Sequence, residues 1–366
     1  MPMTFSPGAE LPEIPVIDIG GGGPLALLEA ALPRARALLA VGREIYPAAA
    51  VRCGDALSRR WLAASAPDYL AEVDAIAARL DAPGAHFLNV SYEWACTCGV
   101  GPVPGDPPAG GSRLLRVLDW SFEGLGAQIV AARFHGDAGL WINLTWPGFV
   151  GCIQAMAPGR FAAAFNQAPQ RRVTGSFPFD WAAGRLRVWR SRALPPALLL
   201  RRVFERCPDY EAAKAMLAET PIALPAIFSL SGLGPEEGCV IERLEDSARV
   251  HEGPVAVANA WLGAGKRDRP RGDSNPERRR LMTEILEREK ADDFAWLRPP
   301  ILNPTTHLAM VAEAASGRLA AVGVEAEKPA TRVLCIEVAP SAERRRSQDS
   351  DNRAMSSGRG PSRAAE

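Results

Sequence analysis

Two cysteines, an arginine and an aspartate form the most chemically informative pattern in this sequence. Cys96 and Cys98 lie one residue apart, just after an apolar and aromatic run that ends in Trp94-Ala95. Arg116 and Asp119 stand at the end of the next apolar run. A reactive thiolate needs a nearby cation and a partner that accepts its proton. The pattern therefore makes Cys96 a candidate nucleophile, released as a new N-terminus if the chain is cut before it.

Cys96 could also have a role other than that of a nucleophile. An isolated cysteine is more often a small buried hydrophobe than a nucleophile. Cys96 and Cys98 together could instead form a redox or metal pair, but none of the four histidines lies within ligand spacing. The glycines at 20–23 are followed by Pro24 and predict a turn rather than a dinucleotide loop. We therefore expect neither a metal nor another cofactor.

The spacing of Arg116 and Asp119 limits how one strand can bring both side chains to the same site. Positions three apart on a straight strand point to opposite faces, and the ordinary interpretation of such a pair is a salt bridge at a strand end. If both residues serve one site, we expect the chain to bend or bulge near Leu118.

Further polar candidates follow in the second half of the chain. Asn259 comes after an apolar run, where an asparagine is either a turn former or a donor to a developing oxyanion. Arg278 opens a predicted helix, and an arginine on a helix face is normally solvated. Asn166 and Gln167 end another apolar run, where an ordinary loop is the simplest interpretation.

Composition excludes some classes of function. The 366 residues have a formal net charge of zero and 47% hydrophobic content, which indicates a globular protein with a large core rather than a nucleic-acid binder. No apolar run is long enough to span a bilayer. The cysteines are odd in number, and the first residues do not read as a signal peptide, so we expect a cytoplasmic protein with free thiols.

The elements that must position these residues change in kind at Cys96. Helical patterns dominate before it, with a break at Pro33 and a short strand at 87–92. Short strands dominate after it, interrupted by helices, which predicts an α+β fold of layered antiparallel sheets with helices packed outside. The predicted strands are 128–135, 140–146, 149–155, 160–166, 226–230, 239–243, 248–251, 255–258, 306–313, 319–324 and 332–338, and the predicted helices are 25–41, 68–80, 194–206, 209–219 and 277–290.

In their order along the chain, these segments resemble the acid ceramidase and N-acylethanolamine acid amidase-like family of choloylglycine-hydrolase-like N-terminal-nucleophile hydrolases. The resemblance runs from about Val16 to Val338. Residues 89–93 before Cys96-Thr97 look like that family's cleavage region, and 116–119 looks like its Arg-x-x-Asp signature. Residues 208–243 are similar to a long family segment, and Asn259 and Arg278 fall where the family has an oxyanion asparagine and a site arginine.

The resemblance implies an αββα sandwich of two antiparallel sheets, with a helical N-terminal segment, and self-cleavage between Ala95 and Cys96. Residues 1–95 would then remain bound as a small subunit, residues 96–338 would form the catalytic domain, and residues 339–366 would be a disordered tail. Cleavage would give Cys96 an α-amine with a pKa of about 7.7–8.0, suited to act as the base for its own thiol.

The resemblance also implies roles for single residues. Cys96 would be the nucleophile, Asp119 would hold its amine, and Arg116 would favour the thiolate. Asn259 would stabilise the oxyanion, and Arg278 would orient the site.

Two positions depart from the family pattern. Asn166 and Gln167 would contact substrate, where the ceramidases carry Asn-Glu-Arg, so the charge of the glutamate is lost here. Cys98 replaces a hydroxyl residue and leaves the choice of nucleophile to Cys96 or Cys98. We favour Cys96, because Thr97 follows it as in the family.

The predicted activity is hydrolysis of the amide bond of a small N-acyl compound, plausibly a lipid-like N-acyl amine in a bacterial cell. The expected partners are this substrate and the protein's own N-terminal fragment, with no nucleic acid and no transmembrane segment. A penicillin-V-type or bile-salt-type acylase, or an acyltransferase, remains an alternative on the same fold. A non-catalytic ligand-binding homologue is the alternative from another class.

Overall fold

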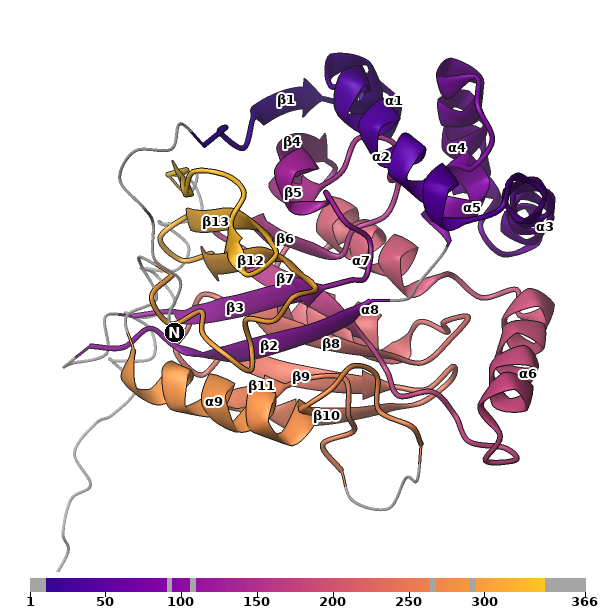
Figure 1. The fold of residues 1–366 in the computed structure, drawn as a ribbon. Coiled ribbons are helices and arrows are strands. Elements are labelled where there is room, and N and C mark those ends of the chain that lie inside the picture. The colour runs from indigo at the N-terminus through magenta and orange to yellow at the C-terminus, as the bar shows by residue number, and fades with distance from the viewer. Residues whose placement is uncertain (1–10, 91–93, 106–109, 264–267, 290–293, 340–366) are drawn as a thin grey trace, which may run out of the picture.

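The computed structural model describes residues 11–90, 94–105, 110–263, 268–289 and 294–339, which form two stacked β-sheets between helices (Figure 1). The helices are α1 (Gly23–Ala30), α2 (Leu32–Ile45), α3 (Ala48–Ser65), α4 (Pro67–Leu80), α5 (Ala85–Asn89), α6 (Phe177–Arg190), α7 (Pro196–Arg206), α8 (Tyr210–Glu219) and α9 (Asn275–Arg288). The predicted disordered tail lies almost wholly outside the described residues.

The strands of the first sheet run in the order β1-β4-β5-β6-β7-β8-β9-β10. They are β1 (Val16–Gly20), β4 (Val130–Gly136), β5 (Gly139–Thr145), β6 (Gln154–Ala157), β7 (Phe161–Gln167), β8 (Ala226–Ser231), β9 (Gly238–Arg243) and β10 (Ala248–Glu252). Only β1 with β4 is a parallel pair among the described strands of this sheet; the others are antiparallel.

The second sheet runs in the order β11-β2-β3-β12-β13-β14, with β15 also paired to β13. Its strands are β2 (Ala95–Pro102), β3 (Ser112–Asp119), β11 (Val255–Val257), β12 (Thr306–Glu313), β13 (Arg318–Glu325), β14 (Lys328–Pro329) and β15 (Leu334–Glu337). All of these pairs are antiparallel. The predicted α+β fold with two antiparallel sheets is confirmed, apart from the parallel β1–β4 pair.

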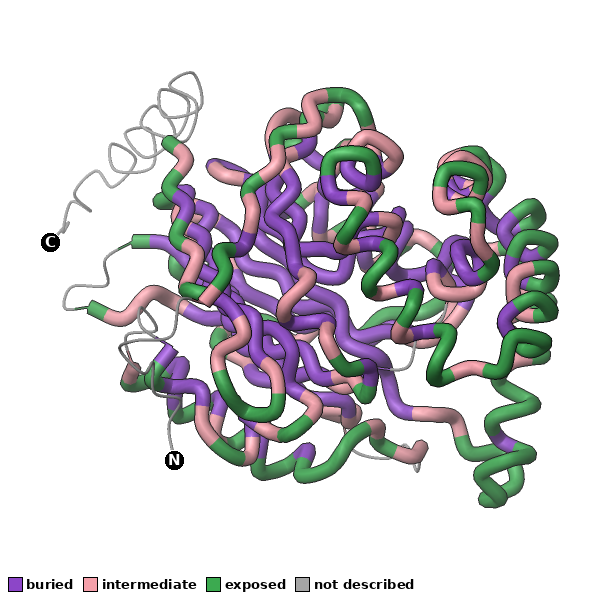
Figure 2. The backbone as a smooth tube through the Cα atoms, turned by 45° about the horizontal axis from the view of Figure 1, so that its top comes forward, coloured by how far each residue is buried: buried purple, intermediate pink, exposed green. Residues whose placement is uncertain are grey.

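The main core lies between the two sheets and consists of the inward side chains of both. The strands in the middle of the molecule are buried along most of their length (Figure 2). Helices α7 and α8 contact the first sheet, and α9 contacts β2 and β11 of the second. Gly99 explains how closely α9 packs, because a Cβ at this position would lie 2.8 Å from a Met282 side-chain carbon. A side chain there would push α9 away from β2, the strand that carries the two cysteines.

The segment before the cysteines is mostly helical and is built into the rest of the molecule. Helices α1 to α5 share a hydrophobic cluster with Val150, Leu194 and Leu198 from later in the chain. Strand β1 adds to the edge of the first sheet, and Glu72 of α4 forms an ion pair with the nearly buried Arg201 of α7. These contacts are non-covalent links that would persist after a cut between the two parts.

Local predictions failed at several elements. The strand predicted at 87–92 is wrong over its described part, where α5 ends at Asn89. The Asn89 side chain donates to Gly148 O and accepts from Val150 N, so this segment is fixed by a loop rather than by a neighbouring strand. The strand predicted at 149–155 begins only at Gln154, because the residues before it form a turn.

Three helices, α3, α5 and α6, were not predicted. In α6, Asp180 is the one buried residue, and six of the nine exposed large apolar side chains in the described chain lie at 173–189. The apolar face that normally marks a packed helix is therefore not turned inward. None of the described helices is both long and apolar enough to cross a membrane.

Candidate active site

The two cysteines and the Arg116–Asp119 pair meet because β2 and β3 are adjacent antiparallel strands. Their register sets Ala95 opposite Asp119 and Cys98 opposite Arg116. Cys96 and Cys98 belong to the core between the sheets, and alternation along the strand turns Thr97 to the other face, toward α9. The two faces of β2 and β3 thus form two halves of one site.

Arg278 of α9 joins the outer half. Its Nη1 donates to Asp119 Oδ2 at 3.0 Å, to Thr97 Oγ1 at 3.2 Å and to the Cys96 carbonyl oxygen at 3.3 Å. Asp119 also accepts from Thr306 Oγ1 at 2.7 Å. Both partners of the ion pair are buried, so each depends on the other for its charge to be tolerated.

Arg116 occupies the inner half, between the sheets, and is completely buried. It donates to Asn166 Oδ1, to Phe165 O at 3.1 Å and to Cys98 Sγ at 3.3 Å, all of them neutral groups when the thiol is protonated. No carboxylate among the described residues forms an ion pair with this guanidinium, and its Nε has no hydrogen-bond partner there. The arrangement favours the appearance of negative charge beside Arg116.

Arg116 and Asp119 thus lie on opposite faces of β3, as strand geometry requires. The bend or bulge expected near Leu118 is not seen in β3, which keeps its register with β2 up to Asp119. The irregularity lies instead in β12, the strand that pairs with β3 at this level, between Thr306 and Leu308. This irregularity allows the Thr306 hydroxyl to reach Asp119.

Asn259, just after β11, contacts the backbone of the nucleophile candidate. Its Oδ1 accepts the Cys96 N–H at 2.6 Å, and its Nδ2 donates to Gln167 O at 2.8 Å. Asn275, at the start of α9, accepts from the Asn259 N–H at 2.7 Å and from Arg278 Nη2 at 3.2 Å. Sequence reasoning missed Asn275, which links the two polar residues; the only local signal was its place at the start of the helix.

Burial controls the ionisation of this site. Burial raises the pKa of the Cys96 thiol to about 12, against the opposing influence of the Arg116 and Arg278 guanidinium groups. It also raises the pKa of Asp119, against the influence of Arg278 and the Thr306 hydroxyl. In the intact chain the Cys96 thiol is therefore protonated at neutral pH, and its reactivity depends on removing this burial or supplying a base.

A cleft of about 760 Å³ opens at the outer half of the site. Ala95, Asp119, Gln167 and Arg278 are among the residues that line it, so the Ala95–Cys96 peptide lies at its wall. Gly272 lines the same cleft with a φ of +64°, and a Cβ there would lie 2.8 Å from Ala95 Cβ. Only glycine allows the chain to pass so close to the residue before Cys96.

A second, apolar pocket adjoins the cleft on the side of the N-terminal helices. Trp94 and Trp120 line both spaces, and their rings contact each other edge to face at 5.4 Å. Trp146 and Phe149 complete the apolar pocket together with side chains of α2, α4 and α5. The sequence did not assign these four aromatic residues to a pocket. Trp94, one residue before Ala95, separates the apolar pocket from the polar cleft.

The structure brings together the five predicted catalytic residues, Cys96, Arg116, Asp119, Asn259 and Arg278, and their roles stay predictions. Of the two predicted substrate-binding residues, one lines the cleft and the other does not. Asn166 is engaged by Arg116, by the Cys98 thiol and by the Ala258 carbonyl, and is absent from the cleft lining. Gln167 lies at the cleft wall.

Comparison with known proteins gives a partial match in sequence. The chain is 33% identical over 112 residues to the acid ceramidase of Homo sapiens, covering 30% of this chain and 26% of that protein. It is 27% identical over 211 residues to a probable acid ceramidase of Caenorhabditis elegans, covering 53% and 51%. The chain thus spans about a quarter of the length of the mammalian relatives it matches, and no family model matches it. The predicted resemblance to acid ceramidases is confirmed over these stretches.

Among solved structures, the N-acylethanolamine-hydrolyzing acid amidase ortholog of Caenorhabditis elegans gives a TM-score of 0.47 at 18% identity, covering 60% of this chain and 93% of that one. Penicillin V acylase from Agrobacterium tumefaciens gives a TM-score of 0.38 at 13% identity, covering 66% and 86%.

Proposed function

We propose that this chain is an N-terminal-nucleophile cysteine amidase that hydrolyses the amide bond of a lipid-like N-acyl amine. The observation that carries the proposal is the convergence of two buried guanidinium groups and a buried carboxylate around Cys96 and its backbone nitrogen, beside a cleft that Asp119 and Arg278 line. The sequence similarity to acid ceramidases, whose name describes hydrolysis of an N-acyl lipid, supports the same reaction class.

We propose that the protein first cleaves itself. The Cys96 thiol attacks the Ala95 carbonyl carbon, the peptide C–N bond breaks, and the acyl group passes from nitrogen to sulfur. Water then hydrolyses this thioester, which leaves a carboxylate on Ala95 and a free thiol and α-amine on Cys96. The contact of the Cys96 N–H with Asn259 Oδ1 supports this step, because the same acceptor can hold the nitrogen before and after the cut.

Cleavage would change the chemistry of the thiol in two ways. A free end at Ala95 can move out of the cleft, so that water reaches Cys96 and the burial that raises its pKa to about 12 is relieved. The new α-amine, with an ordinary pKa of about 7.7–8.0, can accept the thiol proton near neutral pH. Arg116, which has no carboxylate partner in the described chain, then stabilises the thiolate.

Amide hydrolysis follows the same bond changes on a substrate. The Cys96 thiolate attacks the acyl carbonyl carbon, the amine leaves with a proton from the α-ammonium group, and water hydrolyses the acyl-thioester. Asn259 is the proposed oxyanion donor; its Nδ2, now bonded to Gln167 O, would turn to the substrate oxygen. Arg278 forms an ion pair with Asp119 and donates to the Cys96 carbonyl oxygen. These contacts fix the Cys96 backbone and so position its α-amine.

The apolar pocket supports an acyl chain as the occupant on the other side of the nucleophile. The Trp94 ring lies between this pocket and the cleft and, with Ala95, precedes the proposed cut. Release of Trp94 would join the two spaces, and a hydrocarbon chain could then occupy the volume lined by leucines and aromatic rings. We further propose a reducing, cytoplasmic setting, supported by the seven cysteines, all of which are free thiols.

Mass spectrometry and N-terminal sequencing of the purified protein test the self-cleavage. We expect a fragment that begins at Cys96, no cleavage in Cys96→Ala, and continued cleavage in Cys98→Ala, which distinguishes the two sulfurs. Hydrolysis of N-palmitoyl ethanolamine and N-acetyl ethanolamine then tests the acyl preference, and cleavage of the short acyl group alone would contradict the lipid-like substrate. An intact chain that hydrolyses no N-acyl amine would support a non-catalytic homologue instead.

A further inference from the structure

Cys98 is a buried nucleophilic group that the proposed amide hydrolysis does not use. It lies two positions after Cys96 on β2, so the two side chains are on the same face of the strand. Both residues are completely buried and belong to the core between the sheets. Two thiols on one face can react with each other once one of them is oxidised, because a thiolate attacks an oxidised sulfur.

The spacing of the two cysteines decides what kind of bond they can form. A strand rises about 3.2–3.4 Å per residue, which separates Cα atoms two residues apart by about 6.4–6.8 Å. Disulfides occur at Cα separations of about 4.4–6.8 Å, so a Cys96–Cys98 bond lies at the long end of this range. Such a bond is strained while the strand is intact, and strained disulfides are the ones that are easily reduced.

The proposed self-cleavage would relieve this strain. Cys96 would become the first residue of its chain, held on its N-terminal side by the hydrogen bond from its nitrogen to Asn259 Oδ1 at 2.6 Å. A chain end that is held by a hydrogen bond can move toward its neighbour, whereas a residue between two peptide bonds in a strand cannot. The cleaved protein is therefore the form in which the two sulfurs can be joined.

Arg116 can support both sulfurs in turn. Its guanidinium opposes the burial that raises the pKa of the Cys96 thiol, and its Nη1 donates to Cys98 Sγ at 3.3 Å. When Cys96 is oxidised to a neutral sulfenic acid, the guanidinium still contacts Cys98. A cation beside a sulfur stabilises the thiolate, which is the attacking form. One arginine thus serves the oxidation of Cys96 and the attack by Cys98.

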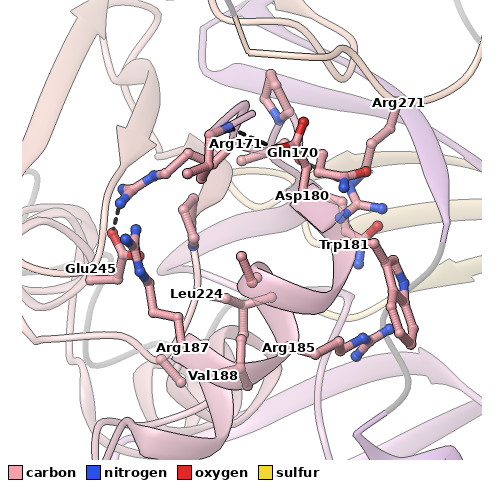
Figure 3. Close-up of a pocket in the computed structure, with 18 residues that line it drawn as sticks. Gln170, Arg171, Asp180, Trp181, Arg185, Arg187, Val188, Leu224, Glu245 and Arg271 are labelled. Carbon is pink, nitrogen blue, oxygen red and sulfur yellow. Dashed lines mark hydrogen bonds and ion pairs between the residues drawn. The ribbon is translucent and has the colours of Figure 1, made fainter. Parts of the chain in front are cut away.

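An oxidant has access to the site through the cleft. Gln170 and Arg271 line both the cleft and a neighbouring pocket between α6 and Glu245 (Figure 3). Hydrogen peroxide is smaller than any N-acyl amine, so it can reach Cys96 wherever the substrate can.

We propose that Cys98 is the resolving thiol for Cys96, and that a peroxide switches the amidase off reversibly by joining the two sulfurs. The Cys96 thiolate attacks one peroxide oxygen, the O–O bond breaks, and the second oxygen leaves as hydroxide. The sulfur loses two electrons to the peroxide and becomes a sulfenic acid. Cys98 then attacks this sulfur, the S–S bond forms, and the S–O bond breaks as hydroxide leaves with the Cys98 proton as water.

The disulfide protects the nucleophile as well as blocking it. A sulfenic acid without a resolving thiol reacts with more peroxide to give a sulfinic acid, which thiols do not reduce. A disulfide is instead returned to two thiols by exchange with a dithiol, which is oxidised in turn. This inference rests on the proposed amidase function and adds a form of regulation to it.

The test measures hydrolysis of N-palmitoyl ethanolamine by the self-cleaved protein before peroxide, after hydrogen peroxide and after dithiothreitol. We expect peroxide to lower the rate at least about tenfold and dithiothreitol to restore it to within about twofold. In the inactive protein, mass spectrometry should show the fragment that begins at Cys96 lighter by two hydrogen atoms. Digestion should place the new bond between Cys96 and Cys98.

Two variants identify the resolving thiol. Cys98→Ser keeps a polar group of similar size, and dithiothreitol should restore less than about a tenth of its starting rate, because Cys96 proceeds to the sulfinic acid. Cys335→Ser is the matched control, since Cys335 is an exposed free thiol of β15, and it should recover like the unchanged protein. Recovery is a ratio of two rates within one variant, which cancels any difference in basal activity.

The outcomes separate this inference from the function on which it rests. Full recovery of Cys98→Ser would overturn the resolving role of Cys98 and leave the amidase function intact. A rate that peroxide leaves unchanged, or inactivation of the unchanged protein without loss of two hydrogen atoms, would also overturn it. Hydrolysis of no N-acyl amine before peroxide is added would refute the amidase function and this inference with it.

Discussion

Replacing Arg116 with methionine should reduce activity by at least about tenfold without unfolding the protein. Arg116 is completely buried, and its partners are two oxygens of neutral groups and a thiol, with no ion pair to a described carboxylate. Removing a guanidinium from water costs several kcal/mol, and apolar replacements of buried ionic groups are often neutral or stabilising by about 1–4 kcal/mol.

The free-energy cost of the hydrogen bonding lost in Arg116→Met is small. Phe165 O loses its Arg116 donor, which costs about 1–3 kcal/mol, whereas Asn166 Oδ1 still accepts from Cys98 Sγ at 3.1 Å. The gain from removing a buried guanidinium and the cost of the lost hydrogen bonding nearly cancel. We therefore expect the free energy of unfolding to change by less than about 2 kcal/mol. Most buried polar residues, in contrast, would destabilise the fold when replaced.

The effect on rate should be large. A cation within reach of a thiol lowers its pKa by about 1–3 units, and each unit is a factor of ten in thiolate at neutral pH. Arg116→Met should therefore reduce kcat/KM roughly 10- to 1000-fold, and Arg116→Lys should recover part of this loss because it restores the charge. The rate of self-cleavage should rank the proteins in the same way, with the unchanged protein fastest, Arg116→Lys slower and Arg116→Met slowest.

The assay separates folding from chemistry. Urea unfolding is compared between Cys96→Ala and Cys96→Ala/Arg116→Met, so that neither protein is processed and both are intact chains. Activity and cleavage are measured in Arg116→Met alone. Destabilisation by more than about 4 kcal/mol together with near-normal activity would refute the assignment of Arg116 to thiolate stabilisation and would make it a structural residue.

Three further changes have defined outcomes. Gly272→Ala should slow self-cleavage at least about tenfold, measured by mass spectrometry over time, because its Cβ would displace the Ala95 side chain 2.8 Å away and its φ is +64°. Thr306→Val removes a hydrogen bond that lowers the pKa of Asp119; this pKa should rise, so the acid limb of the kcat/KM profile should move to higher pH. Glu72→Gln removes a carboxylate from a nearly buried guanidinium of α7 and should weaken retention of the N-terminal fragment by about 1–3 kcal/mol, measured by urea-dependent gel filtration.

Each of these three substitutions has a control variant in which the same type of residue is replaced in the same way elsewhere in the chain. Gly139→Ala tests strain alone, since Gly139 has a φ of +108° with nothing within 4 Å of the added Cβ. Thr283→Val removes an exposed hydroxyl that bonds Arg279 O on α9 instead of Asp119. Glu29→Gln breaks an exposed pair in the same N-terminal segment. If a control changes its readout as much as the test variant, the corresponding explanation is wrong.

The sequence by itself determined the class of fold and the set of residues worth placing together. Short strands with turns at hairpin spacing predict layered sheets, and the ends of apolar runs carry the candidate residues Cys96, Arg116, Asp119 and Asn259. Alternation along a strand also fixed that Arg116 and Asp119 face opposite ways.

Only the tertiary structure decided how these residues share a site. The β2–β3 register and the packing of α9 bring Arg278 against Asp119 and Cys96, and Asn275 joins it to Asn259. The pockets depend on contacts across the chain, between Trp94 and the N-terminal helices on one side and between α6 and Glu245 on the other. Such contacts join residues far apart in sequence, whose pairing is set by the closure of the whole core, so no local pattern encodes them.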